Sequence, residues 1–210
     1  MQNRRRHEDE DGEMFGKDKG FTVSEWNGPN DTRGWSIFVY GPIISAEQMV
    51  EAMMAFSSAN EGDTVIVYLS TGGGCIDATD TFIDGMRECR GRVVVKASGA
   101  VHSAGTLILL NAPEFSLSAG FNSLFHNGSV GYGGKYSDWR KGAAFISKAM
   151  ERLFSETYVG FLTPDELERL IRGEDFWMDA EEFLERHKRQ QEHFAKLHEQ
   201  QQEDVVEEQQ

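Results

Sequence analysis

The strongest constraint on the fold is a repeated local pattern, in which a short apolar run passes through small residues into a helix. Residues 64–69 (Thr-Val-Ile-Val-Tyr-Leu) form an uninterrupted run, followed by a glycine-rich turn at 70–74 and a helical pattern over 76–90. Residues 92–95 (Arg-Val-Val-Val) repeat this arrangement and lead through small residues to the apolar segment 106–110. Such runs are typical of buried strands, and strands that alternate with helices indicate an α/β domain.

Other segments extend the same alternation. Further strands are expected at 36–40 and 123–125, and further helices at 45–58, at 137–159 and from Pro164 onwards. Ser45 and Gln48 have the spacing of a capping box, which predicts that Ser45 begins its helix. Thr163 is expected to cap the next helix, because proline is favoured at the first helical position.

The two ends differ from the middle, so we expect three segments. Residues 1–30 are predicted to be a flexible N-terminal segment, 31–182 a single domain, and 183–210 a charged helical or disordered tail. Within the tail, five residues alternate at spacings of four and three: Phe183, His187, Gln190, Phe194 and Leu197. This pattern fits either a weak coiled-coil seam or a solvated helix that frays, and the solvated helix is the favoured interpretation.

Composition narrows the function classes. The net charge of −14 argues against nucleic acid as a partner, because nucleic-acid binding needs a basic surface. No apolar run reaches the roughly 18–20 residues of a membrane span, and no secretory signal is visible, so we expect a cytoplasmic protein without a membrane partner. The two cysteines, Cys75 and Cys89, are expected to be reduced thiols. The six histidines show no metal-ligand spacing, so neither a metal nor a cofactor is expected.

Three polar residues are candidates for chemistry. Ser103 lies among small residues between a predicted strand and an apolar helix, where it could be a nucleophile or simply an N-cap. His126 follows a predicted strand, and could be a general base or a histidine bonded to the backbone. Asp175 lies beside large apolar residues, and could orient a histidine or cap the helix that follows. Each residue alone allows either interpretation.

Four segments in this order resemble the ClpP-type serine peptidases, the proteolytic subunits of the Clp protease in the crotonase-like superfamily. They are residues 66–74 (Ile-Val-Tyr-Leu-Ser-Thr-Gly-Gly-Gly), 100–105 (Ala-Val-His-Ser-Ala-Gly), 124–128 (Leu-Phe-His-Asn-Gly) and 174–182 (Glu-Asp-Phe-Trp-Met-Asp-Ala-Glu-Glu). The resemblance implies a ClpP/crotonase-like α/β fold, a spiral of repeated ββα units. A charged N-terminal segment and a helical acidic C-terminal extension would be added to it.

The resemblance also implies a peptidase site with named residues. The catalytic residues would be Ser103 as nucleophile, His126 as general base and Asp175 as its orienting group. The oxyanion hole would be formed by the backbone N–H groups of Gly74 and Ala104, and substrate would contact Gly73, Cys75 and Asn127. His102 beside Ser103 is a rival base, but adjacent residues point in different directions, so His126 is favoured.

The resemblance implies peptides or unfolded proteins as substrates. It also implies assembly with other copies of the chain into single or stacked rings of six or seven subunits, and an AAA+ ATPase as a partner. Both chain ends depart from the family pattern, which leaves the ATPase open and suggests a divergent, phage-encoded branch. Three alternatives stay open: a catalytically silent assembly subunit, a phage capsid-processing peptidase, and an acyl-CoA-handling crotonase enzyme. The acyl-CoA alternative is not favoured, because the sequence shows no basic patch for the phosphates of CoA.

Overall fold

A seven-stranded sheet forms the centre of the protein, whose computed structural model describes residues 20–129 and 135–208. The strands are β1 (Phe21–Asn27), β2 (Arg33–Tyr40), β3 (Thr64–Thr71), β4 (Arg92–His102), β5 (Glu114–Leu117), β6 (Asn122–Phe125) and β7 (Phe176–Asp179). Their order is β1-β2-β3-β4-β6-β7, and β5 pairs with β4. The neighbours β2, β3, β4 and β6 are parallel, whereas β1 and β7 are antiparallel at the edges. This arrangement confirms the α/β fold.

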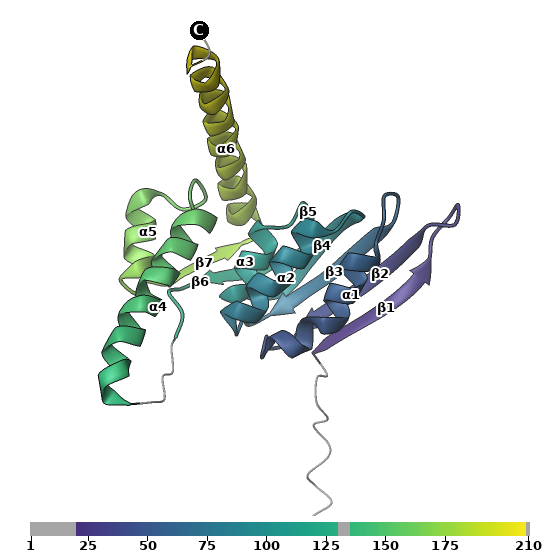
Figure 1. The fold of residues 1–210 in the computed structure, drawn as a ribbon, viewed down its shortest axis with the longest axis horizontal. Helices are drawn as coiled ribbons and strands as arrows, with labels where there is room; N and C mark the ends of the chain where they lie inside the picture. Colours follow the sequence, from purple (N-terminus) through teal and green to yellow (C-terminus); the bar gives the residue numbers. More distant parts are fainter. Residues whose placement is uncertain (1–19, 130–134, 209–210) are drawn as a thin grey trace, which may run out of the picture.

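Helices cover one face of the sheet and extend beyond one end of it (Figure 1). The helices are α1 (Val50–Ser58), α2 (Ile76–Glu88), α3 (Ala104–Leu110), α4 (Tyr136–Thr157), α5 (Pro164–Ile171) and α6 (Ala180–Glu208), and a 3₁₀ turn over Ala46–Met49 precedes α1. In Figure 1, α1, α2 and α3 lie over the sheet, whereas α4 and α5 lie beyond β6 and β7. Among the described helices, none is both long enough and apolar enough to cross a membrane.

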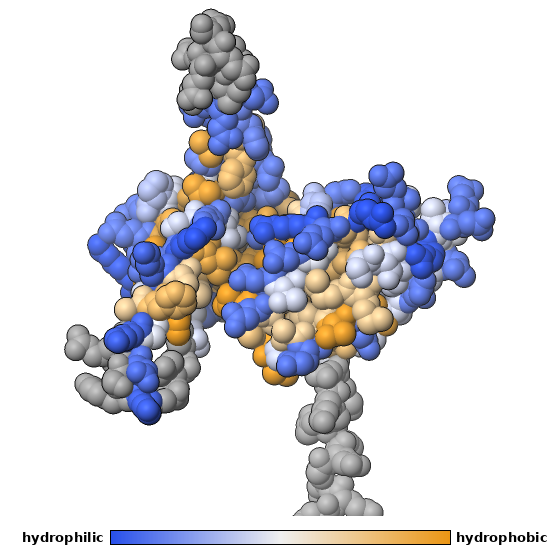
Figure 2. All heavy atoms as spheres, viewed as in Figure 1, coloured by the Kyte–Doolittle hydropathy of each residue, from blue (hydrophilic) through white to orange (hydrophobic). Residues whose placement is uncertain are grey.

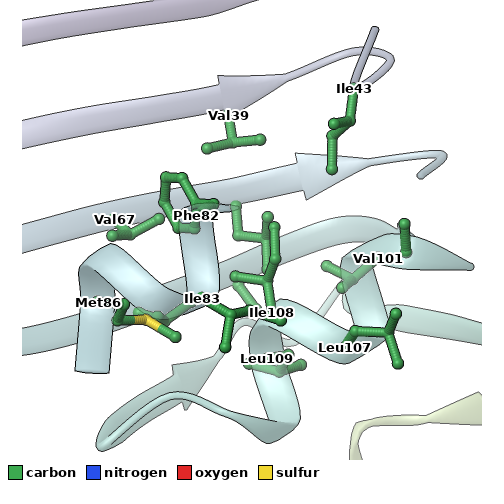
Figure 3. Close-up of a cluster of buried hydrophobic side chains, with 14 of the residues drawn as sticks. Val39, Ile43, Val67, Phe82, Ile83, Met86, Val101, Leu107, Ile108 and Leu109 are labelled. Atoms are coloured by element: carbon green, nitrogen blue, oxygen red, sulfur yellow. The ribbon is translucent and has the colours of Figure 1, made fainter. Parts of the chain in front are cut away.

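The core lies between the sheet and helices α1 to α3. Along β3 every second residue is buried, so Val65, Val67 and Leu69 face the helices with no exposed surface. Figure 3 shows Val67 near Phe82 of α2, with Ile108 of α3 close by. This layer fixes α3, and therefore the residue that precedes it, against the sheet.

Strand β4 is longer than the sequence predicted, and it carries an irregularity near its end. Its first part pairs with β5, from Val94 to Ala97, and its second part pairs with β6, from Ala100 to His102. The register with β3 shifts between these parts, where Gly99 has a φ of 60°. Bulges of this kind bend a strand and redirect its side chains. The bend allows β4 to pair with β5 and then with β6, and to end at His102, directly before Ser103.

The N-terminal boundary predicted from the sequence is wrong, because β1 lies inside the segment that was expected to be flexible. Phe21 is buried, and its ring meets Phe82 of α2 edge-to-face at 6.4 Å. The ring of Trp26 lies over Gly34, where a Cβ atom would be only 2.1 Å away. These contacts with distant residues order a segment whose own composition is polar. Residues 1–19 lie outside the described part of the chain.

The two predicted helix caps have different outcomes. Thr163 and Glu166 form the full capping box of α5, with Pro164 in the first position, as predicted. The predicted box at Ser45 is wrong, because its side chain makes no capping hydrogen bond. Gln48 instead accepts from the N–H of Ile44 at 2.9 Å, one residue earlier than a capping box requires.

The C-terminal segment 183–210, predicted to be a charged helical or disordered tail, is a helix up to Glu208. Helix α6 begins on the domain itself, which corrects the interpretation of a solvated tail. Asp179 accepts from the N–H of Glu182 at 3.0 Å and so caps the helix. Phe183 is fully buried, and Gln190 is buried and donates to the carbonyl groups of Thr157 and Val159. The first three turns of α6 therefore pack against the same chain. Beyond them the helix projects away from the body (Figure 1).

Phe183→Ala tests whether this packing stabilises the domain. Phe183 contacts a group of aromatic rings: Phe115, Phe121, Phe125 and Phe161. We expect the free energy of unfolding, measured by chemical denaturation, to fall by about 3–5 kcal/mol. The control is the adjacent Leu184→Ala, because Leu184 is 48% exposed and its loss should change stability by less than about 0.5 kcal/mol. Equal losses for both variants would contradict the docking of α6.

Candidate active site

Ser103 is a single residue between β4 and α3, and its backbone is strained. Its φ is 54° and its ψ is −124°, a backbone conformation that residues other than glycine rarely adopt. The Ser103 N–H donates to the carbonyl of Leu124 at 2.8 Å. Its carbonyl accepts from the N–H of Thr106 at 2.9 Å and from the Thr106 hydroxyl at 2.7 Å. Bonds on both sides therefore hold a conformation that costs about 1–3 kcal/mol and that is typical of functional sites.

The N-cap interpretation of Ser103 is wrong. Although Ser103 precedes the first residue of α3, its hydroxyl makes no capping hydrogen bond. Gly73, with a φ of 91°, packs against it so closely that a Cβ atom there would lie 2.6 Å from the Ser103 Cβ. Glycine is therefore required at position 73 by both its conformation and its neighbour. The hydroxyl of Ser103 is left available for chemistry.

Two backbone N–H groups near Ser103 lack partners among the described residues. An isolated bridge joins Ile43 to Gly74: Ile43 donates to the Gly73 carbonyl at 2.9 Å and accepts from the Cys75 N–H at 2.8 Å. The bridge occupies the carbonyl group of Gly73 and the N–H group of Cys75, and leaves the Gly74 N–H without a partner among the described residues. The Ala104 N–H is free because the first residue of a helix has no acceptor one turn before it.

A cavity of about 770 Å³ opens in front of Ser103, bordered by α2, α3 and α4. It brings together seven of the eight predicted site residues: Gly73, Gly74, Cys75, Ser103, Ala104, His126 and Asn127. Leu107, Phe145 and Phe154 give it an apolar wall, and Figure 2 shows apolar surface between α4 and the helices over the sheet. The cavity can therefore hold an apolar side chain beside a hydroxyl and two free donors.

His126 and Asp175 are brought to one corner by the pairing of β6 and β7. The last pair of this antiparallel ladder is Phe125 with Phe176, so His126 directly follows this pair in the chain and Asp175 directly precedes it. Asp175 is exposed, and it is not among the described residues that line the cavity. The two residues flank the paired ends of β6 and β7 although they are 49 positions apart in the chain.

The three predicted catalytic residues are not hydrogen-bonded to one another in this conformation. The Nδ1 atom of His126 accepts from the Gly128 N–H at 3.1 Å. An accepting Nδ1 carries no proton, so the proton of a neutral ring would be on Nε2. Within residues 20–129 and 135–208, no hydrogen bond links His126 to Ser103 or to Asp175. The structure therefore gathers Ser103 and His126 at one cavity and leaves Asp175 at the neighbouring strand end, without forming a relay.

His102, the rival base, is engaged elsewhere. Its Nε2 atom is 2.8 Å from the side-chain oxygen of Asn122, and its ring meets Trp177 edge-to-face at 5.1 Å. It is not among the described residues that line the cavity. This arrangement agrees with the expectation that His102 and Ser103 point in different directions.

Sequence reasoning missed two groups at the site. Thr106 joins the Ser103 carbonyl to the hydroxyl of Tyr158 at 2.8 Å, and burial raises the pKa of that tyrosine far above its usual value. Asp77 and Asp80 line the cavity from α2. Partial burial, then the charges of Asp84 and Asp77, raise the pKa of Asp80. The helical spacing of these aspartates after the glycine turn was the signal that could have identified them.

Comparison with known proteins identifies the family. Residues 32–186 match the family model described as Clp protease. The chain belongs to the Clp protease family. The match covers every strand except β1 and contains all eight predicted site residues. Membership supports a peptidase function.

Curated Clp protease subunits are similar to most of the chain. ATP-dependent Clp protease proteolytic subunit 3 of Rhizobium etli is 30% identical over 178 residues, which cover 82% of this chain and 90% of the relative. Subunit 3 of Rhizobium meliloti is 30% identical over 156 residues, covering 70% and 77% of the two chains. Subunit 2 of Pseudomonas aeruginosa is 26% identical over 156 residues, covering 71% and 76%. The resemblance found in four short segments thus extends over most of the domain.

Proposed function

We propose that the protein is a serine endopeptidase in which Ser103 is the nucleophile, His126 the general base and Asp175 the group that orients the histidine. The Ser103 Oγ attacks the carbonyl carbon of the scissile peptide bond while its proton passes to Nε2 of His126. The same proton then goes to the leaving amine, which departs and leaves an acyl group on Ser103. A water molecule, deprotonated by His126, then attacks this ester. The bond from the acyl carbon to Ser103 Oγ breaks, the proton on His126 returns to Oγ, and the carboxylic acid product leaves.

The observation that carries this proposal is the strained conformation of Ser103, which lines the cavity and makes no capping hydrogen bond. It lies beside Gly74 and Ala104, whose N–H groups lack partners among the described residues. A tetrahedral intermediate needs two such donors for its negatively charged oxygen. The apolar wall from α3 and α4 suits a substrate side chain, and the carboxyl groups of Asp77 and Asp80 lie on the opposite, α2 side.

His126 has to change its hydrogen bonds before it can act as the base. Its Nδ1 accepts from Gly128, whereas a general base needs an unprotonated Nε2 and an N–H on Nδ1 directed at a carboxylate. We infer that Nδ1 of His126 gives up its hydrogen bond from Gly128 and donates one to Asp175 before the first proton transfer. The β6–β7 ladder supports this exchange, because its last pair, Phe125 and Phe176, is formed by the chain neighbours of His126 and Asp175.

Covalent labelling tests these roles. A fluorophosphonate reagent should add one label to the wild-type protein, mapped by peptide mass to Ser103. We expect His126→Ala to slow labelling by at least about 10²-fold, because a general base contributes about 10²–10⁴. The control is His102→Ala, which should react at the wild-type rate since its ring contacts Asn122 and Trp177. Equal labelling of the wild-type and His126→Ala proteins would remove His126 from the mechanism.

We also propose that the subunits assemble into rings and act on unfolded polypeptides. The relatives' names describe proteolytic subunits of an ATP-dependent protease, which supports assembly with further subunits. Large apolar side chains support assembly, because Ile44 is 63%, Val50 53% and Met54 63% exposed in the single chain. Surface of this kind is often covered in an assembly. The ATPase that the relatives' names imply is proposed as a partner of this chain as well.

A further inference from the structure

The segment that carries Asp175 is a short connection from α5 to β7, and the end of α5 determines its path. The Gly173 N–H donates to the Leu170 carbonyl at 2.9 Å, and the Glu174 N–H donates to the Arg169 carbonyl at 3.0 Å. With Gly173 at a φ of 103°, these two bonds form a Schellman motif. The backbone is therefore fixed up to the residue before Asp175.

The side chain of Arg169 contacts the residues on both sides of Asp175. Its guanidinium forms a two-point ion pair with Glu174, with Nε donating at 2.7 Å and Nη2 donating to the second oxygen. The same group lies over the ring of Phe176, 5.3 Å from its centre. A planar guanidinium is suited to this combination of a forked ion pair and a stacked ring. Asp175 is thus held between two residues that share one clamp.

The clamp fixes both neighbours of Asp175 beside the end of β6. The antiparallel ladder ends with the pair Phe125 and Phe176, and His126 directly follows this pair in the chain while Asp175 directly precedes it. On the histidine side, the Asn127 amide donates to the Ile171 carbonyl at 3.3 Å, which ties this strand end to the same end of α5.

We propose that Arg169 is a positioning residue, which holds Asp175 in reach of His126 through Glu174 and Phe176. The inference rests on the proposed function of Ser103, His126 and Asp175. Arg169 and Glu174 are nearly half exposed, so their ion pair contributes little to stability. The ion pair instead affects the position of Asp175, and a misplacement of about 1 Å can reduce an enzymatic rate by up to about 10²-fold.

The test compares Arg169→Gln with Arg172→Gln. Arg172 lies on the same helix and pairs with Glu168, but this pair does not contact the neighbours of Asp175. We expect Arg169→Gln to lower kcat for a small peptide by about 10-fold and leave KM within about two-fold, whereas Arg172→Gln stays at the wild-type value. The thermal midpoints of the two variants should agree. Equal kcat values in both variants would overturn the proposal.

A double-mutant cycle distinguishes positioning from a general structural effect. In an Asp175→Asn background, Arg169→Gln should have no further effect on the rate of fluorophosphonate labelling, because its target is already lost. A full additional loss in that background would show that Arg169 acts by another route and overturn the proposal. Glu174→Gln provides the same cycle if Arg169→Gln does not fold. Ser103→Ala, measured in parallel, tests the proposed function separately: activity that survives it refutes the peptidase site itself.

Discussion

We expect Ser103→Ala to hydrolyse a small fluorogenic peptide at least about 10⁴-fold more slowly than the wild-type protein. The change removes the atom that would form the acyl-enzyme and leaves the cavity otherwise intact. The two proposed oxyanion donors are backbone N–H groups of Gly74 and Ala104, which line the cavity, so they remain in the variant. Substrate should therefore still bind, and the loss should be seen in kcat while KM changes little.

A second serine provides the matched control for this experiment. Ser129 also lines the cavity, but it is an exposed residue that follows Gly128 and does not precede a helix. Ser129→Ala should keep the wild-type rate to within about two-fold. Equal hydrolysis by wild type and Ser103→Ala would refute the nucleophile. The thermal midpoint of Ser103→Ala should match that of the wild type, because the hydroxyl makes no capping bond.

Native mass measurement on the same two proteins tests the proposed assembly. Wild type and Ser103→Ala should give the same mass of six or seven subunits, or of two stacked rings. A monomer would contradict the proposed ring. A wild-type ring that hydrolyses no peptide, even with an ATPase added, would instead support the alternative of a non-catalytic assembly subunit.

Local signals account for what the sequence predicted well. Thr163, Pro164 and Glu166 lie within four residues of one another and determine the start of α5 without help from the rest of the fold. The apolar run in β3 was recognisable because its residues are in the most buried part of the sheet. In both cases the residues that form the structure are adjacent in the chain.

The features that the sequence did not predict depend on distant contacts. Strand β7 has four residues and is defined by its pairing with β6, more than fifty positions earlier. The docking of Phe183 requires Phe115, Phe121 and Phe161, which no periodicity within α6 can indicate. The same applies to the strand β1, which is ordered by Phe82 and by β2.

The candidate site shows the same division. The sequence identified residues that line the cavity through the resemblance of four segments to the ClpP-type peptidases, in which small residues and turns allow a close approach of the backbone. It could not predict that Ser103 has a positive φ or that His126 bonds to Gly128, since both depend on how β4, β6 and the following segment meet. The contacts of Arg169 with Glu174 and Phe176 likewise cannot be predicted without the path of the chain from α5 to β7.

Gly74 is the position where the backbone itself is expected to take part in catalysis. Its φ is 147°, and a Cβ atom there would lie 1.9 Å from the Ile43 carbonyl oxygen. Any larger residue must therefore push the chain away from Ile43, which breaks the bridge that now fixes the direction of the Gly74 N–H. The hydroxyl and the base would be unaffected, so the loss would fall on the stabilisation of the oxyanion.

We expect Gly74→Ala to lower kcat by about 10²–10³-fold, as the removal of one oxyanion donor typically does. Gly72→Ala is the control, because Gly72 lines the same cavity but a Cβ atom there has no heavy atom within 4 Å. Its kcat should stay within about two-fold of the wild type. Peptide hydrolysis, measured together with the thermal midpoint, separates a loss of catalysis from a loss of folding. If Gly74→Ala folds and keeps the wild-type kcat, the Gly74 N–H does not bind the oxyanion. The second donor must then come from elsewhere.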